Sequence, residues 1–315
     1  MTLKPLPFLV KPGPKPPRKE QREKRKIPMT LVAALSGGDG TILFADTEEV
    51  VGAYSTRKID KLAVWDCDSF RVGIAGATTD GTYADMLQAE ILAELSKLPV
   101  FDIRAINTTL SDVLTAFYSK HIWPRAGEKP QMEYLMVIQP LPQGHPEVIY
   151  ISETAANIVH EEYRTVGVGR YLADYIFKQI FQAPLPVSGR ESFSLLCAAG
   201  VYAAKEVREN IDGVGPVDRI AAFGRNGEYD ELYPVDISKI EESLSSIQEF
   251  LGYFYGDVMD VDNRHFAREP YADGFIQDIR SSHQSWYDEW KNRLASRQRI
   301  RNMLKKKAAD SGNLA

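Results

Sequence analysis

The chain has 315 residues, and 44% of them are hydrophobic, which suits a globular domain with its own core. Its net charge of -5 gives no overall case for binding nucleic acid or a membrane surface. Two cysteines exclude a disulfide scaffold and favour a reducing compartment, so we expect a cytoplasmic protein. Five scattered histidines show no zinc spacing, and no apolar run approaches the roughly 18 residues of a membrane helix. We therefore expect no metal, no cofactor and no membrane association.

Residues 1–28 differ from the rest in composition. They hold seven prolines and nine Lys or Arg residues against two Glu, a mixture that cannot bury a core. We expect this basic, proline-rich tail to be disordered. It is a propeptide, a solvated tail, or a segment translated from too early a start codon, since Met29 is a second possible start.

Three polar residues follow at the ends of predicted strands. An alternating apolar run after Thr30 predicts the first strand, and a turn at residues 37–40 predicts a tight hairpin. The second strand ends at Asp46, and a third predicted strand at 55–59 carries Lys58. Because antiparallel pairing brings strand starts and strand ends together, we expect these three side chains to meet at one end of a sheet.

This trio suits nucleophilic catalysis. A threonine hydroxyl is a weak nucleophile unless a base lies beside it, and the α-amine of an N-terminal threonine can be that base. A nearby lysine would keep the amine neutral, and a carboxylate would hold the lysine in place. Thr30 therefore requires cleavage of the bond before it, since an internal threonine has an amide nitrogen and no amine.

The stretch from Thr30 onward resembles the catalytic subunits of the proteasome superfamily, the 20S β-subunits and the HslV-like peptidases. Ala45-Asp46 lies sixteen residues after Thr30, as in that family. The segment 57–62, RKIDKL, matches the family's lysine strand at Lys58, although the connecting turn is about four residues shorter. The segment 70–80 resembles the family's G-x-x-A-G-x-x-x-D pattern, with Gly76 in the place of the glycine that binds the oxyanion.

The resemblance covers residues 30–223, roughly six tenths of the chain. It implies an α+β fold, a four-layer αββα sandwich of the N-terminal-nucleophile (Ntn) hydrolase type. It also implies a threonine peptidase or amidohydrolase with Thr30, Asp46, Lys58 and Gly76 as catalytic residues. The substrate would be a peptide or small amide, and the chain would form a homo-oligomer, for which the family offers the ring as one form. An ATPase partner is left open.

Apolar residues at helical spacing predict four helices after this stretch, and alternating residues predict the strands between them. We expect a helix capped by Asp80 and ended by Pro99, and helices at 102–122, 170–181 and 192–211. We expect strands at 133–139 and 147–152, a further short strand pair within 154–166, and a strand ending at Phe223.

The sequence departs from the family at three positions near the expected site. Val168 stands where relatives have a serine, and Asn210 and Gly213 align roughly with an Asp and a Ser. Asp212 could replace the lost carboxylate after a small register shift. These losses favour the alternative hypothesis. In it, the chain is a catalytically inactive subunit with a structural or assembly role, not an active hydrolase.

We divide the chain into the tail 1–28, a proteasome-like domain 29–228 and a helical C-terminal extension 229–315. The extension opens with a capping box, Asp236 to Glu241, and ends in a helix at 281–307 with a basic terminus. The basic termini permit a third hypothesis, a nucleic-acid adaptor, which the overall charge makes unlikely.

Overall fold

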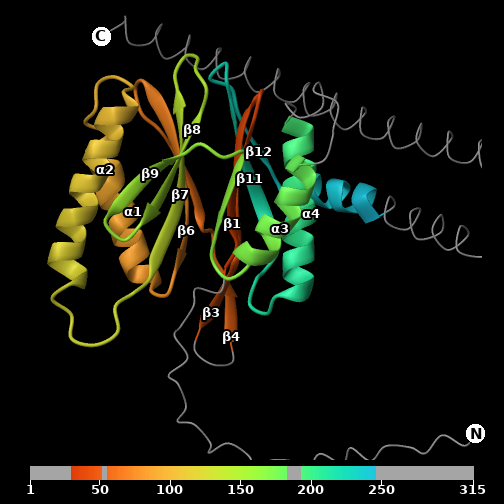
Figure 1. The fold of residues 1–315 in the computed structure, drawn as a ribbon, viewed down its shortest axis with the longest axis horizontal. Helices are drawn as coiled ribbons and strands as arrows, with labels where there is room; N and C mark the ends of the chain where they lie inside the picture. Colours follow the sequence, from red (N-terminus) through yellow and green to blue (C-terminus); the bar gives the residue numbers. More distant parts are fainter. Residues whose placement is uncertain (1–29, 52–54, 183–192, 246–315) are drawn as a thin grey trace, which may run out of the picture.

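The computed structural model describes residues 30–51, 55–182 and 193–245. Two antiparallel five-stranded sheets face each other, and a pair of helices covers the outer face of each sheet (Figure 1). The prediction of a mixed α and β fold is confirmed. The tail 1–28, Met29 and the last predicted helix lie outside the described residues.

The sheet that begins next to Thr30 is called the β1 sheet. Its central hairpin pairs β1 with β2 through a tight turn, and Gly37 lies opposite Gly40. Gly40 has φ +149, and a Cβ there would come within 2.1 Å of the Phe223 carbonyl oxygen, so only glycine fits this turn. The expected hairpin is therefore confirmed. In spatial order the strands are β10 (Tyr163–Val166), β1 (Val32–Gly37), β2 (Gly40–Asp46), β11 (Val217–Gly224) and β12 (Tyr229–Leu232).

The second sheet, called the β6 sheet, contains the segment with Gly76. Its strand order follows the chain: β5 (Leu62–Asp66), β6 (Phe70–Thr78), β7 (Met132–Pro140), β8 (Glu147–Ser152) and β9 (Ala155–Val159). Our prediction of a short strand pair within 154–166 is correct for the two strands but wrong for their pairing. Both strands form, but β9 pairs with β8 while β10 crosses to the other sheet and pairs with β1.

A small hairpin separates the two sheets in sequence. It pairs β3 (Glu48–Val51) with β4 (Ser55–Lys58), and it belongs to neither large sheet (Figure 1). The chain therefore leaves the β1 sheet at Asp46 and enters the β6 sheet only at Leu62. This detour determines which lysine reaches the site.

Three apolar clusters hold these layers together. One lies between the β1 sheet and its helices, and a second lies between the β6 sheet and its helices. The third fills the space between the two sheets, where Leu43 and Phe223 meet Ala75 and Leu135. Each sheet is therefore buried on both faces, which explains why β2 has no exposed residue.

The four expected helices all form. On the β6 sheet, α1 (Gly81–Leu95) begins at Asp80, whose side chain accepts a hydrogen bond from the Thr82 N–H at 3.2 Å. Leu87, Ile91 and Leu95, which recur at helical spacing, are buried, whereas Met86 is 37% exposed. The other helices are α2 (Ile103–Phe117), which continues as the π-helical turn η1 (Tyr118–Ile122), α3 (Arg170–Gln182) and α4 (Phe193–Asn210).

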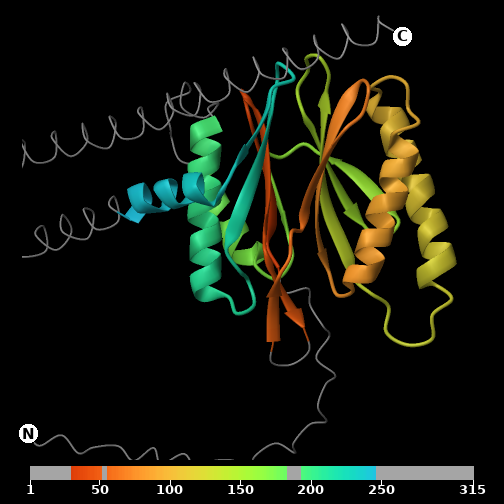
Figure 2. The same ribbon diagram turned by 180° about the vertical axis from the view of Figure 1, so that it is seen from behind.

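The domain continues past the boundary that we predicted at 228. Strand β12 completes the β1 sheet, and a helix at 234–245 follows it. Ile237 and Ile240 of this helix are buried in the same cluster as residues of α4. Figure 2 shows the start of the helix, in blue, beside α4. The helix starts two residues before Asp236, whose side chain accepts from the Tyr233 N–H at 3.3 Å. None of the helices in the described ranges is long and apolar enough to cross a membrane.

Candidate active site

Thr30 lies immediately before β1, where its side chain is 3% exposed. A backbone turn holds it from one side: the Gly169 N–H donates to the Thr30 carbonyl oxygen at 3.3 Å. Gly167 adopts φ +91, and a Cβ there would lie 2.2 Å from the same oxygen. Only glycine permits this close approach, so the turn before α3 fixes the position of Thr30.

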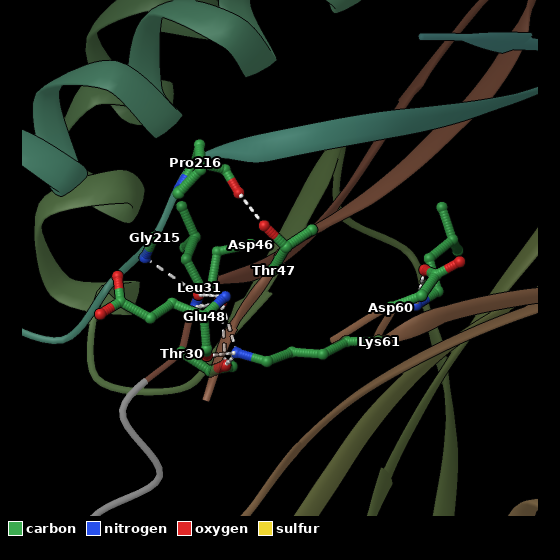
Figure 3. Close-up of polar contacts among 10 residues, drawn as sticks. Thr30, Leu31, Asp46, Thr47, Glu48, Asp60, Lys61, Gly215 and Pro216 are labelled. Atoms are coloured by element: carbon green, nitrogen blue, oxygen red, sulfur yellow. Dashed lines mark hydrogen bonds and ion pairs between the residues drawn. The ribbon is translucent and has the colours of Figure 1, made fainter. Parts of the chain in front are cut away.

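Asp46 is the centre of the site. Its side chain is fully buried at the end of β2. One carboxylate oxygen, Oδ1, accepts from the Thr30 hydroxyl at 2.8 Å and from the Leu31 N–H at 2.9 Å. The other, Oδ2, accepts from the N–H groups of Glu48 at 3.1 Å and Gly215 at 3.0 Å (Figure 3). The backbone donors hold the carboxylate in one orientation beside the threonine.

The cation of the cluster is Lys61. Its ammonium lies 2.9 Å from Asp46 Oδ1 and also contacts the Thr30 hydroxyl oxygen and the Glu48 carbonyl oxygen (Figure 3). The side chain of Lys61 is only 9% exposed. A buried charge of this kind needs both an opposite charge and hydrogen-bond acceptors, and the site provides both.

The structure does not bring Lys58 to this cluster, so our expectation that Lys58 meets Thr30 and Asp46 is wrong. Lys58 ends β4 in register with Glu48, its side chain is 69% exposed, and its ammonium pairs with Asp218. The physical reason is the separate hairpin: β4 does not join the β1 sheet, so its residues lie outside the row of strand ends that meet at Thr30. Lys61, just before β5, is carried back to that row.

A signal in the sequence pointed to Lys61. The alignment on Lys58 left the connecting turn about four residues shorter than in the family. Lys61 lies three residues later and removes most of that difference.

Gly76 lies on β6, opposite Tyr134 of β7. The last pair between β5 and β6 joins Leu62 to Ala75, so the register, continued by one residue, places Gly76 opposite Lys61. The β6 sheet therefore brings this glycine toward the cluster. A Cβ at Gly76 would lie 2.4 Å from the Tyr134 ring, so packing alone already requires a glycine there.

The positions that depart from the family behave differently from one another. Val168 packs on the apolar cluster of the β1 sheet and supplies no hydroxyl. Asn210 ends α4 and donates to the Glu206 carbonyl oxygen at 2.8 Å, and Asp212 is exposed. The residue of this loop that reaches the site is Gly215, through its N–H. Every residue type except proline carries that group, so the hydrogen bond itself gives no sequence motif, although a Cβ at this position would lie only 2.4 Å from the Glu48 Cβ.

Comparisons with known proteins place the fold. No family model matches the sequence, and no curated protein matches it. Among solved structures, an Anbu mutant from Hyphomicrobium sp. strain MC1 is 12% identical, with a TM-score of 0.53, covering 75% of this chain and 100% of its own. Anbu from Yersinia bercovieri, described as an ancestral β-subunit, is 10% identical with a TM-score of 0.55, covering 72% of this chain and 97% of its own.

A third solved structure is the Anbu complex from Pseudomonas aeruginosa, described as a helical assembly. Its subunit is 12% identical with a TM-score of 0.57, covering 76% of this chain and 100% of its own. At such low identities these similarities establish the fold alone. The chain therefore has a proteasome-like fold of the kind found in Anbu subunits.

Proposed function

We propose that the chain is a proteasome-like N-terminal threonine hydrolase of the αββα Ntn type, which cleaves amide bonds through Thr30. The observation that carries the proposal is the hydrogen-bonded cluster of Thr30, Asp46 and Lys61, buried at the end of the β1 sheet. A hydroxyl that touches both a buried carboxylate and an ammonium is suited to nucleophilic attack.

The mechanism follows from these contacts. After cleavage before Thr30, its Oγ1 attacks the amide carbonyl while the new α-amine accepts the proton, directly or through a water molecule. The Lys61 ammonium lowers the cost of forming the alkoxide and keeps the amine neutral, and Asp46 orients Lys61. The Gly76 N–H stabilises the oxyanion, a contribution of about 2.7–4 kcal/mol in comparable sites. The tetrahedral intermediate collapses as the α-ammonium gives its proton to the leaving amine nitrogen and the C–N bond breaks, which leaves the acyl group on Thr30 Oγ1. Water then hydrolyses the acyl-enzyme ester and restores the Thr30 hydroxyl.

The competing proposal is a proteasome-like subunit that assembles without cleaving. The observations in its favour are the apolar Val168 and the exposed Asp212, because neither supplies the polar side chain that relatives use near the nucleophile. It predicts that Thr30 keeps the residue before it and never acquires an amine.

Substrate and partners are proposed more broadly. The substrate is a peptide or a small amide, and we infer homo-oligomerisation because one structural relative is described as a helical assembly. A cytoplasmic location, which both free cysteines favour, remains a prediction, and we propose no ATPase partner.

The first test is the intact mass and N-terminal sequence of the protein expressed from Met1, and of a second version that starts at Met29. A mature chain that begins with Thr30 in either preparation supports the hydrolase. If both preparations retain Met29, the threonine has no amine, and the non-catalytic subunit is the better account.

The second test uses the nucleophile itself. A peptide epoxyketone should label the processed protein at Thr30, because that warhead reacts with both the hydroxyl and the amine. Thr30→Ala should abolish labelling and amide hydrolysis while the circular dichroism spectrum is unchanged, and Thr30→Ser is the matched control that keeps a hydroxyl. Hydrolysis by purified Thr30→Ala at the wild-type rate would show that another group is the nucleophile.

A further inference from the structure

Strand β11 contains an irregularity that faces the site lysine. Its register against β2 shifts between Val217 and Ile220, so Asp218 and Arg219 occupy a bulge. Both side chains reach the segment that connects β4 to β5. Asp218 pairs with the exposed Lys58, and Arg219 pairs with Asp60 at 3.1 Å. Bulges commonly re-aim side chains next to active sites, and this one directs two charges at the residues around Lys61.

Arg219 binds on both sides of Lys61. Its guanidinium contacts the Asp60 carboxylate, which precedes the lysine, and the Leu62 carbonyl oxygen, which follows it. The same Asp60 carboxylate accepts from the Leu62 N–H at 3.1 Å and closes a tight turn around Lys61. In Figure 3 the Asp60 side chain lies near the backbone end of Lys61, and the Lys61 side chain extends from there to Thr30. The guanidinium therefore bridges the two ends of the turn.

We propose that Arg219 is a positioning residue for Lys61. It acts by fixing the 60–62 turn against the β1 sheet, and this inference rests on the proposed hydrolase function. Arginine suits the task because its planar guanidinium offers donors in fixed directions, and here one terminal nitrogen, Nη2, contacts both the Asp60 carboxylate and the Leu62 carbonyl oxygen. Its side chain is 24% exposed, so water screens its ion pair only in part.

The need for such a residue follows from the route of the chain. Lys61 belongs to the start of the β6 sheet, whereas its partners Thr30 and Asp46 belong to the β1 sheet. A lysine has a long flexible stem, so its ammonium holds a fixed place only if its backbone does. β11 and the loop before it contact both partners of the ion pair. The Gly215 N–H of the loop donates to Asp46, and Arg219 of the strand binds the turn that carries Lys61.

The kinetic test compares Arg219→Ala with Arg219→Lys in the processed protein. Arg219→Ala should lower kcat by up to about a hundredfold with little change in KM, as expected when a reacting group is displaced by about 1 Å. Arg219→Lys keeps the charge but not the planar guanidinium, so it should fall between Arg219→Ala and the wild type. Lys58→Ala removes the other ion pair of the bulge, between the exposed Lys58 and Asp218. It is the matched control and should keep the wild-type kcat.

A second readout does not depend on turnover. Trace acetylation with acetic anhydride, followed by peptide mass spectrometry, reports how accessible each lysine is. In the wild type Lys61 should react far more slowly than Lys97, whose side chain is 64% exposed. Arg219→Ala should raise the reactivity of Lys61 severalfold relative to Lys97. Asp60→Asn, an exposed substitution that keeps the oxygen of the turn but loses the charge, should raise it as well.

The two readouts separate the two claims. Increased Lys61 acetylation in a protein that never hydrolyses amides would keep the positioning role and remove the hydrolase. Unchanged acetylation in both folded variants, or a kcat that Arg219→Ala leaves at the wild-type value in an active enzyme, would overturn the positioning role. If Arg219→Ala does not fold, Asp60→Asn decides the question by the same measurement.

Discussion

At the scale of single residues, two lysines three positions apart have opposite surroundings. Lys61 is 9% exposed and contacts a hydroxyl, a carboxylate and a carbonyl oxygen, whereas Lys58 is 69% exposed and has a surface carboxylate as its partner. An ammonium that acts on Thr30 must touch it, and only Lys61 does so. The pair therefore separates a site residue from a surface residue of the same type and the same stretch.

Lys61→Ala is expected to lower kcat/KM for amide hydrolysis by about 100- to 10,000-fold, the range found for positioned acid–base groups. The reason is the loss of the only charge that contacts both Thr30 and Asp46 in the described part of the chain. Steady-state kinetics with a fluorogenic peptide measures this effect, and Lys58→Ala serves as the control. Equal losses in the two variants would remove the distinction between them.

Asp46→Asn tests the same cluster through stability. The amide keeps the shape of the side chain but leaves the Lys61 ammonium buried without its counter-charge, which costs about 3–5 kcal/mol when one partner of a buried pair is removed. We expect a fall of this order in the free energy of unfolding, measured by urea denaturation.

The control for that measurement is Asp218→Asn, whose partner Lys58 is exposed. Surface pairs contribute about 0–1 kcal/mol, so this change should scarcely move the urea midpoint. A similar small effect from Asp46→Asn would mean that the buried pair does not hold the site together.

At the scale of elements, the two sheets approach closely where β6 passes β11. A Cβ at Gly73 would lie 2.3 Å from the tip of the Phe223 ring, so this glycine makes room for the aromatic side chain between the sheets. Gly73→Ala should therefore destabilise the fold by about 1–3 kcal/mol, the usual cost of overpacking a core. Thermal unfolding measures the change. Adding Phe223→Leu, which shortens the opposing side chain, should recover part of the loss, whereas strictly additive effects would rule out the clash.

The helices and most strands could be predicted because their periodic apolar residues report directly on burial. The row Leu87, Ile91 and Leu95 shows this for α1. Pairing between strands could not be predicted, since β9 and β10 are short neighbours in sequence that join different sheets. The same limit explains why we predicted Lys58 and not Lys61 as the site lysine. Nothing in the sequence of residues 48–58 distinguishes a third strand of the β1 sheet from an independent hairpin.

The part of the site that could be predicted consists of the residues at the open end of one hairpin. Thr30 and Asp46 lie where the hairpin of β1 and β2 requires, because the register of that hairpin is fixed by its tight turn. The N–H of Gly215 comes from the loop before β11 and the guanidinium of Arg219 from β11 itself, about 170 residues after Asp46, and only the tertiary fold brings them near.

At the scale of the whole molecule, a buried thiol on α4, that of Cys197, makes stability depend on pH. Burial raises the pKa of the Cys197 thiol to about 12 from its ordinary value of 9.0, with Asp230 adding to the effect. The unfolded thiol ionises first as the pH rises. The contribution of Cys197 to stability is therefore complete below pH 9 and is lost as the pH approaches 12.

Urea unfolding at pH 8 and pH 10 should show this loss, at about 1.4 kcal/mol per pH unit above the ordinary thiol pKa. Cys197→Ala should reduce the difference in the free energy of unfolding between pH 8 and pH 10, even though it lowers this free energy at both pH values. Burial also raises the pKa of the Tyr134 hydroxyl, so part of the pH dependence should remain. An identical pH dependence in both proteins would contradict the assignment to Cys197.

The hydrogen bond from Gly215 to Asp46 spans 169 residues of chain. During translation at about 5–20 residues per second, roughly 10 to 30 s separate the appearance of the carboxylate from that of its last backbone donor. The site is therefore unfinished while the polypeptide is being synthesised, and Thr30 acquires its full set of neighbours only after the loop before β11 has been made. If Thr30 is the nucleophile that we propose, its reactivity is therefore delayed until the residues that complete its surroundings have been made.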